Sequence, residues 1–284
     1  MLKTSDTEVL LPIYNKKGPN VMKIYKKRNF FSFKISIPSV TWLCVTSSFL
    51  TFFFCVIWSI LYNFEEANAT HCSVENFLPS ISAAIGHFYP QIYVWNTSVI
   101  LQMIPRLKIA TIYLHYYSSV IHEKYFHLCY LSWIFNICEL WALLGLSLIT
   151  STSNYNIHAF CFVSFLFSSM FYMVLSCFLL KFRRKIPLEN SEKGSVKWKI
   201  RCSIINICCF FLAGYFFRRH NIYCEPRVYS LFAFFEYGVV ASNILFHFSA
   251  VWDFYDRIMT IDSSYCGFQI DYNPPYKSAI YDFK

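Results

Sequence analysis

His220 and Glu225 lie five residues apart. The spacing resembles the His-plus-acid pairs with which some acyltransferases deprotonate an acceptor hydroxyl. Imidazole titrates near neutral pH and is a suitable general base, and a neighbouring carboxylate holds its ring in one orientation. This spacing also arises often by chance, and Glu stands here where such pairs usually have Asp. The pair is therefore a candidate acyl-transfer site and does not by itself identify an enzyme.

Glu236, Asn243 and His247 recur at i, i+7 and i+11, which places an acid, an amide and an imidazole on one helix face. Glu139 is a further acid inside an apolar stretch. An ionisable group at mid-bilayer costs about 2.5–3.5 kcal/mol on translocon scales, so it needs a partner or a function. One interpretation is a polar cavity for a charged lipid head group, with Glu236 as base or cation partner. The other is hydrogen bonding that fixes helix packing, with Glu139 paired to Arg106 on a neighbouring helix.

The composition of the chain places these residues in a membrane protein. Of its residues, 56% are hydrophobic and only 14% are charged, which is too apolar for a soluble surface. Six stretches of roughly 20 residues are each long enough to cross a hydrocarbon core about 30 Å thick. They lie at 38–62, 91–114, 127–150, 157–180, 200–217 and 229–252. The sequence thus predicts an all-α, polytopic fold, a bundle of six transmembrane helices.

The distribution of basic residues predicts the orientation of this bundle. The chain has no Lys or Arg from residue 35 to residue 105, whereas the preceding residues are rich in Lys. By the positive-inside rule, both termini are then cytosolic. Three arginines are exceptions, because they lie in the last predicted lumenal loop: Arg218, Arg219 and Arg227.

The predicted domains follow from this topology. A basic cytosolic tail spans 1–37, and the six-helix domain spans 38–252, with lumenal loops at 63–90, 151–156 and 218–228. A cytosolic tail spans 253–284, for which we expect no regular structure. The net charge of +9 belongs to segments that flank apolar stretches, so we expect no nucleic-acid partner.

Cys72 and Cys224 both fall in predicted lumenal loops, unlike the other ten cysteines. The oxidising secretory lumen favours a disulfide between them, worth roughly 2–4 kcal/mol. Two alternatives remain open: a pair of free thiols, or a zinc site that adds His71 and His220 as ligands. The zinc site lacks the local spacing of common motifs, so we expect no metal.

Asn68 begins the sequence Asn-Ala-Thr, an N-glycosylation sequon in the first predicted lumenal loop. Its position close to the end of the first span brings any glycan near the membrane surface. A glycan at Asn68 is therefore a candidate modification, with steric exclusion as the alternative.

Several blocks of sequence resemble the post-GPI attachment to proteins factor 2 family. The blocks in the predicted lumenal loops are Ala69-Thr70-His71-Cys72, the ten residues 77–86, and Arg219-His220-Asn221-Ile222-Tyr223-Cys224-Glu225. Further similarity lies at Asn136-Ile137-Cys138-Glu139 and at Phe235-Glu236-Tyr237, Asn243 and Phe246-His247. The resemblance covers residues 40–254.

The resemblance implies a multi-pass protein of Golgi and endoplasmic reticulum membranes that acts in fatty-acid remodelling of glycosylphosphatidylinositol (GPI) anchors. The implied step is re-acylation of lyso-GPI with a saturated chain in the lumenal leaflet, so the implied partners are lyso-GPI lipid or GPI-anchored proteins. No cofactor is expected, and the sequence does not identify the acyl donor.

Two hypotheses about the activity remain open. In the first, the protein is an acyltransferase that holds the lipid hydroxyl near His220 or His71, with Glu225 or Glu236 orienting the imidazole. In the second, it is a non-catalytic partner that presents the lipid to a separate acyltransferase.

Five residues are candidates for substrate binding in either case, because they are polar groups in or beside apolar spans. They are Arg106, Glu139, Glu236, Asn243 and His247.

Overall fold

The computed structural model describes residues 32–188, 190–262 and 267–272. These residues belong to two compact units. Residues 36–256 form the helical unit, and the strands on either side of it in sequence belong to the other unit.

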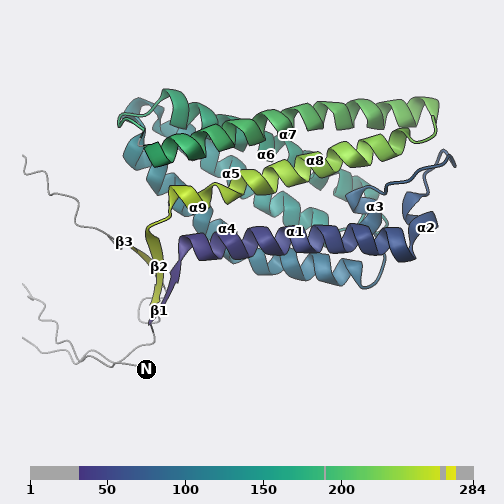
Figure 1. Ribbon diagram of the computed structural model, residues 1–284, viewed down its shortest axis with the longest axis horizontal. Coiled ribbons are helices and arrows are strands. Elements are labelled where there is room, and N and C mark those ends of the chain that lie inside the picture. Colours follow the sequence, from purple (N-terminus) through teal and green to yellow (C-terminus); the bar gives the residue numbers. More distant parts are fainter. Residues whose placement is uncertain (1–31, 189, 263–266, 273–284) are drawn as a thin grey trace, which may run out of the picture. The chain divides into compact units, whose positions relative to one another are not determined.

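Six long helices make up most of the helical unit (Figure 1). They are α1 (Ile37–Tyr62), α4 (Gln91–Val120), α5 (Phe126–Leu148), α6 (Tyr155–Phe182), α7 (Asn190–Tyr223) and α8 (Val228–Phe248). Short helices lie between or after them: α2 (Phe64–Asn68), α3 (Ile81–Ile85), the 3₁₀ helix η1 (Glu123–Tyr125) and α9 (Ala250–Asp253).

Five of the described helices are long and apolar enough to cross a membrane, namely α1, α5, α6, α7 and α8. The chain is therefore a multi-pass membrane protein. The α4 helix has 30 residues, but polar residues such as Arg106 and Lys108 lower its hydropathy.

The six long helices close into a ring. Each packs on two neighbours in the order α1, α4, α5, α6, α7, α8 and back to α1. Two glycines permit close approach within this ring. A Cβ atom added at Gly238 of α8 would lie 2.6 Å from Sγ of Cys209 on α7, and one at Gly145 of α5 would lie 2.8 Å from Sγ of Cys161 on α6. Small residues at helix contacts are typical of membrane bundles, because they let helix backbones approach closely where the hydrophobic effect does not drive association.

Polar side chains begin two of the long helices. Ser36 Oγ accepts a hydrogen bond from the backbone N–H of Ser39 at 3.2 Å, and Asn154 Oδ1 accepts one from Ile157 at 3.1 Å. Each cap satisfies an N–H group that lacks a partner in the first helical turn. Residues close in sequence therefore determine where α1 and α6 begin.

The fifth predicted stretch, 200–217, is much shorter than α7, which runs from Asn190 to Tyr223. Hydropathy detects only the apolar part of a helix, whereas the backbone hydrogen bonds continue into polar turns at both ends. The predicted loop 218–228 is thereby reduced to the four residues 224–227 between α7 and α8. The predicted loop 63–90 contains the short helices α2 and α3.

Three strands form the second unit: β1 (Ser32–Ser36), β2 (Arg257–Asp262) and β3 (Gly267–Tyr272), in the sheet order β1-β2-β3. Strands β2 and β3 are antiparallel, with Arg257 opposite Tyr272 and Asp262 opposite Gly267. The expectation that 253–284 has no regular structure is therefore wrong for β2 and β3. The sequence of this segment alone does not show that it pairs with β1, which lies far away in the chain. Residues 1–31 of the predicted basic tail lie outside the described residues.

Candidate functional site

Cys72 and Cys224 form a disulfide, with an S–S distance of 2.07 Å. The predicted bridge is thus confirmed. It joins the segment after α2 to the turn between α7 and α8, at the right of Figure 1. We call this the disulfide end of the helical unit.

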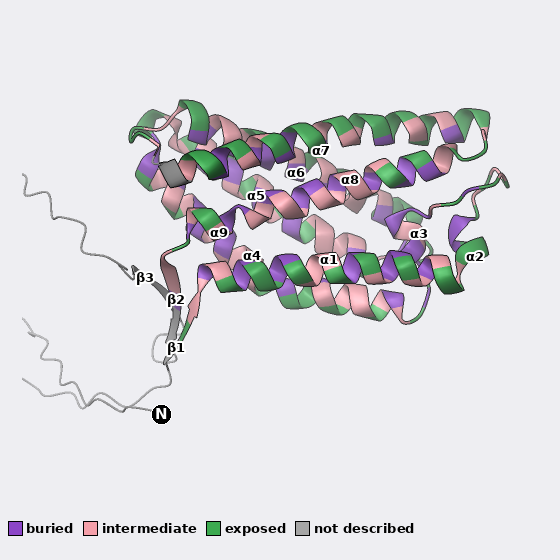
Figure 2. Cartoon of the chain, viewed as in Figure 1, coloured by how far each residue is buried: buried purple, intermediate pink, exposed green. Residues whose placement is uncertain are grey.

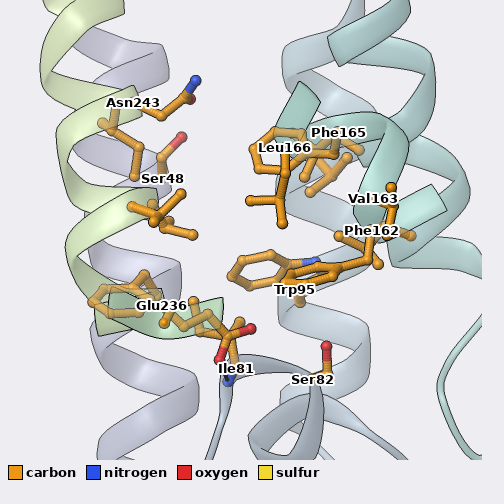
Figure 3. Close-up of a pocket in the computed structure, with 18 of the residues that line it drawn as sticks. Ser48, Ile81, Ser82, Trp95, Phe162, Val163, Phe165, Leu166, Glu236 and Asn243 are labelled. Carbon is orange, nitrogen blue, oxygen red and sulfur yellow. Dashed lines mark hydrogen bonds between the residues drawn. The ribbon is translucent and has the colours of Figure 1, made fainter. Parts of the chain in front are cut away.

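A cavity of about 320 Å³ lies inside the ring of helices, between the disulfide end and the middle of the helical unit. Most of its walls are aliphatic and aromatic side chains. Figure 3 shows the ring of Trp95 in the cavity, beside Phe162 of α6. The indole Nε1 of Trp95 donates to Ser147 Oγ at 3.0 Å, so the ring is held in place. A cavity with such walls suits an apolar chain.

Residues 77–85 close the disulfide end of this cavity, and we call them the plug. Three side chains of α8 bind the backbone of the plug. Ser230 Oγ accepts from two successive N–H groups at 2.8 and 3.1 Å, and Tyr237 donates its hydroxyl to a carbonyl at 2.5 Å. Glu236 Oε2 accepts from the N–H of Ile81 at 3.0 Å, as Figure 3 shows at one end of the cavity. Hydrogen bonds therefore fix both the plug and the Glu236 carboxylate.

Glu139 is the centre of a buried polar cluster. Its side chain has no solvent exposure, and its Oε1 accepts hydrogen bonds from Arg106 Nη2 at 3.2 Å, Asn243 Nδ2 at 3.1 Å and His247 Nε2 at 2.9 Å. Asn243 also donates to Ser169 Oγ at 2.6 Å. The cluster joins α4, α5, α6 and α8, which supports the packing interpretation for Glu139.

Glu236 does not belong to this cluster, although the helical spacing placed it on the same face as Asn243 and His247. Among the predicted substrate-binding residues, Arg106, Glu236 and Asn243 line the large cavity. Arg106 and His247 line a second cavity of about 40 Å³. The Arg106 side chain therefore borders both cavities while it neutralises Glu139.

The structure does not bring His220 and Glu225 together as a hydrogen-bonded pair. Both carboxylate oxygens of Glu225 accept from the Arg219 guanidinium, at 2.6 and 2.9 Å. This bidentate pair holds the pKa of the Glu225 carboxyl below its ordinary value. His220 is 1% exposed, and neither of its ring nitrogens has a hydrogen-bond partner among the described residues.

His71 and His220 do lie close together, with ring centroids 5.6 Å apart. His220 also packs on the ring of Tyr229, with centroids 5.1 Å apart, and the Tyr229 hydroxyl donates to Ser80 Oγ in the plug at 2.9 Å. Neither histidine is among the residues that line the large cavity. Of the predicted proton-transfer groups that could face an apolar chain, Glu236 alone borders the cavity.

The residues of the alternative zinc site lie close together, but their cysteines cannot act as zinc ligands. Ligand atoms of His71, Cys72 and His220 lie within 4.8 Å of one another. Zinc binds cysteine as the thiolate, however, and both sulfurs of the predicted set are joined in the disulfide. Two imidazoles are too few for a tetrahedral protein site.

Asn68, the predicted glycosylation site, is only 5% exposed. Its Nδ2, the atom to which a glycan would be attached, donates to the carbonyl of Phe64 at 2.9 Å within α2. The folded structure therefore disfavours a glycan at Asn68.

Comparison with known proteins assigns the chain to a family. Residues 36–257 match the family model described as the Frag1/DRAM/Sfk1/Cwh43P N-terminal domain. The chain is 42% identical over 214 residues to "Post-GPI attachment to proteins factor 2" of Drosophila melanogaster, which covers 75% of this chain and 84% of that protein. The chain belongs to the post-GPI attachment to proteins factor 2 family. Another relative is "Acyltransferase PGAP2" of Xenopus tropicalis, 36% identical over 256 residues that cover 89% of this chain and 98% of that protein.

The post-GPI attachment to proteins factor 2 of Caenorhabditis elegans is 38% identical over 219 residues, which cover 75% of this chain and 83% of that protein. No solved structure is significantly similar to the chain. The resemblance read from sequence blocks is thus confirmed, and the geometry described above is that of a member of the post-GPI attachment to proteins factor 2 family.

Sequence reasoning missed several groups at the cavity. Trp95, Ser82 and Gln102 line it, and neither spacing nor charge singled them out. Ser80 could have been recognised from the sequence, because a Ser before an apolar run is a typical helix N-cap. It caps α3 by accepting from Ala83 N at 3.1 Å.

Proposed function

We propose that this protein takes part in fatty-acid remodelling of GPI anchors, by re-acylating lyso-GPI with a saturated chain in the lumenal leaflet of Golgi and endoplasmic reticulum membranes. The names of its relatives support this proposal, since they refer to post-GPI attachment and to acyl transfer. The structural observation that carries it is an apolar cavity with a buried carboxylate, Glu236, at the disulfide end.

The proposed topology places the disulfide end in the lumen and both termini in the cytosol, with α4 as a sixth membrane span. An oxidising lumen supports a disulfide at that end. The position of α4 between α1 and α5 in the ring supports a sixth span. The pairing of Arg106 with Glu139 also supports it, because a neutralised charge is less costly at mid-bilayer.

We assign Glu236 the role of general base for the lipid hydroxyl. The hydroxyl proton passes to the carboxylate as the hydroxyl oxygen attacks the carbonyl carbon of the acyl donor, whose bond to its leaving group then breaks. The hydrogen bond from Ile81 to Glu236 Oε2 supports this role, because it orients the carboxylate toward the cavity without neutralising it. Positioning of the hydroxyl beside the base would contribute to the acceleration, because it makes the reaction effectively unimolecular.

A non-catalytic role, in which the cavity presents the lipid to a separate acyltransferase, is the second candidate. One observation favours it: His220 and His71 lie outside the cavity, and Glu225 is occupied by Arg219. In this case Glu236 would bind a polar group of the lipid and accept no proton.

Turnover by the purified protein distinguishes the two candidates. The full chain in lipid nanodiscs is supplied with a lyso-GPI analogue and an acyl donor, and the acylated product is measured. For an enzyme, we expect Glu236→Gln to lower kcat by about 10²-fold or more, as for loss of a general base, with binding of the lyso-lipid retained. Glu66→Gln is the matched control, since Glu66 is an exposed acid that pairs with His87 outside the cavity.

Each outcome has a definite meaning. Full turnover by Glu236→Gln would exclude Glu236 as the base. Loss of turnover in His220→Ala, with Glu236→Gln active, would return that role to the histidine pair. Binding of the analogue by the wild type without turnover, under conditions where a known acyltransferase is active, would establish the presenting role.

A further inference from the structure

The solvent exposure of the residues that line the large cavity shows where it opens. Those on α1, α3, α4, α5 and α8 are buried or half-buried. Four cavity-lining residues are instead exposed on the outside of the helical unit, and all four belong to α6 or α7: Tyr155, Val163, Gly214 and Phe217. A residue that both lines a cavity and faces outward marks an opening. The cavity therefore opens sideways, between α6 and α7.

The plug makes this lateral opening the favoured route into the cavity. It blocks the disulfide end, where Ser230, Glu236 and Tyr237 bind its backbone. At the other end of the cavity, Arg106 and Asn243 are tied to buried Glu139. An apolar chain that entered along the bundle axis would have to break one of these sets of hydrogen bonds.

The wall of the opening on α7 includes Gly214, which has free space where a side chain would be. A Cβ atom added at Gly214 would meet no atom within 4 Å. Gly238 on α8 is the opposite case, since a Cβ atom there would press against Cys209. The glycine at 214 is thus not required for contact between helices, and it leaves the opening wide. Figure 2 shows that α7 is exposed along much of its length.

Arg218 lies one helical turn beyond Gly214, at i+4, and therefore on the same side of α7. Its side chain is exposed and forms no ion pair with any residue that the structure describes, whereas the next residue, Arg219, pairs with Glu225. Arg218 lies five positions before Tyr223, the end of α7, which is about 8 Å along the helix axis. The positive-inside rule does not account for a basic residue at this end in the proposed topology, which makes Arg218 a candidate for a local contact.

We propose that the opening between α6 and α7 admits a single-chain phospholipid from the membrane, and that Arg218 binds its phosphate. The chain passes over Gly214 into the apolar cavity, while the head group stays outside at the level of Arg218. A guanidinium is well suited to this contact, because its planar fork donates two hydrogen bonds to one phosphate. The inference rests on the proposed function, since it supplies the route by which the lyso-lipid reaches Glu236.

Photo-crosslinking of two single-chain probes tests the route. One probe is lysophosphatidylinositol and the other is a monoacylglycerol, each with a diazirine at the end of the same acyl chain. The full-length protein in nanodiscs is irradiated, and labelled residues are located by mass spectrometry. We expect both probes to label cavity residues of the wild-type protein, with Trp95 and Phe162 as candidate positions.

Two substitutions separate the opening from the phosphate contact. A tryptophan at Gly214 (Gly214→Trp) should lower cavity labelling by both probes about tenfold or more, because it fills the opening. Leu212→Trp is its matched control, as Leu212 is 40% exposed on α7 and does not line the cavity. Arg218→Ala should lower labelling by lysophosphatidylinositol at least about tenfold, because both charge-assisted hydrogen bonds to the phosphate are lost, and leave the monoacylglycerol unaffected.

The outcomes distinguish the route from the function. If the cavity of Gly214→Trp is labelled as strongly as that of the wild type, the lateral route is wrong. If Arg218→Ala changes labelling by both probes equally, the phosphate contact is wrong. If Gly214→Trp does not yield a monodisperse protein, Val163→Trp blocks the same opening from α6 and is judged by the same criterion. A wild-type cavity that no probe labels removes the route altogether. Labelling as predicted, combined with no acyl transfer, would retain the route and refute the enzyme.

Discussion

The Glu139→Gln substitution is expected to destabilise the protein by about 3 kcal/mol. Gln keeps the size and one oxygen acceptor of Glu, but it has no charge to balance Arg106. Breaking a buried ion pair by removing one partner typically costs about 3–5 kcal/mol, because the other charge remains uncompensated. We expect the lower limit, since the Arg106 side chain is 16% exposed and borders two cavities, where polar groups or water can reach it.

Thermal unfolding of the purified protein in detergent measures this effect. At about 2–4 °C per kcal/mol, the melting temperature should fall by roughly 10 °C. Glu66→Gln is the control, because its partner His87 is 50% exposed and such surface pairs contribute at most about 1 kcal/mol. The double variant Arg106→Leu/Glu139→Gln should recover much of the loss, since it removes the unpaired guanidinium and keeps an oxygen acceptor for Asn243 and His247. A Glu139→Gln variant within about 1 kcal/mol of wild type would refute the reasoning.

Three further predictions concern groups outside this cluster. Cys72→Ser should lower the free energy of unfolding by about 2–5 kcal/mol, because the bridge to Cys224 closes a long loop. Alkylation of both cysteines in the native protein without a reductant would contradict the bridge. Asp253→Asn should lower the free energy of unfolding by about 3–5 kcal/mol, since it leaves the fully buried ammonium of Lys199 without its carboxylate. Chemical denaturation measures this loss, and a value below about 1 kcal/mol would count against the pair. The carboxyl of Glu225 has a lowered pKa in the folded protein, so its contribution to stability is present above its unfolded pKa and is lost as the pH falls through the folded value. The melting temperatures of wild type and Glu225→Gln should therefore converge as the pH falls below the ordinary range of a Glu carboxyl, and a constant difference would contradict the pairing.

Features that depend on composition or on nearby residues were predictable. Apolar stretches of sufficient length identify membrane helices, because the bilayer core imposes one length on all of them. The disulfide between Cys72 and Cys224 was also predictable, since the two cysteines fall in loops that charge places on the same side. The end of α7 was not, because polar turns extend a helix without any signal in hydropathy.

The candidate site shows where such reasoning stops. Helical spacing placed Glu236 on one face with Asn243 and His247, yet Glu236 binds the plug while the other two bind Glu139. Spacing along one helix gives a direction for each side chain and says nothing about which element lies opposite at each level. For the same reason it paired His220 with Glu225, although Arg219 is the residue that reaches that carboxylate.

The sequence by itself determined that this is a helical membrane protein of the post-GPI attachment to proteins factor 2 family, with a bridge between two distant loops. Hydropathy, charge and short motifs are local properties, and each can be read without knowing which helices touch. The tertiary structure alone decided that α1 and α4 to α8 close into a ring, that the plug seals one end of the cavity, and that the cavity opens between α6 and α7. These features depend on contacts between residues far apart in the chain, where packing and hydrogen bonding select among many helix arrangements with the same local pattern.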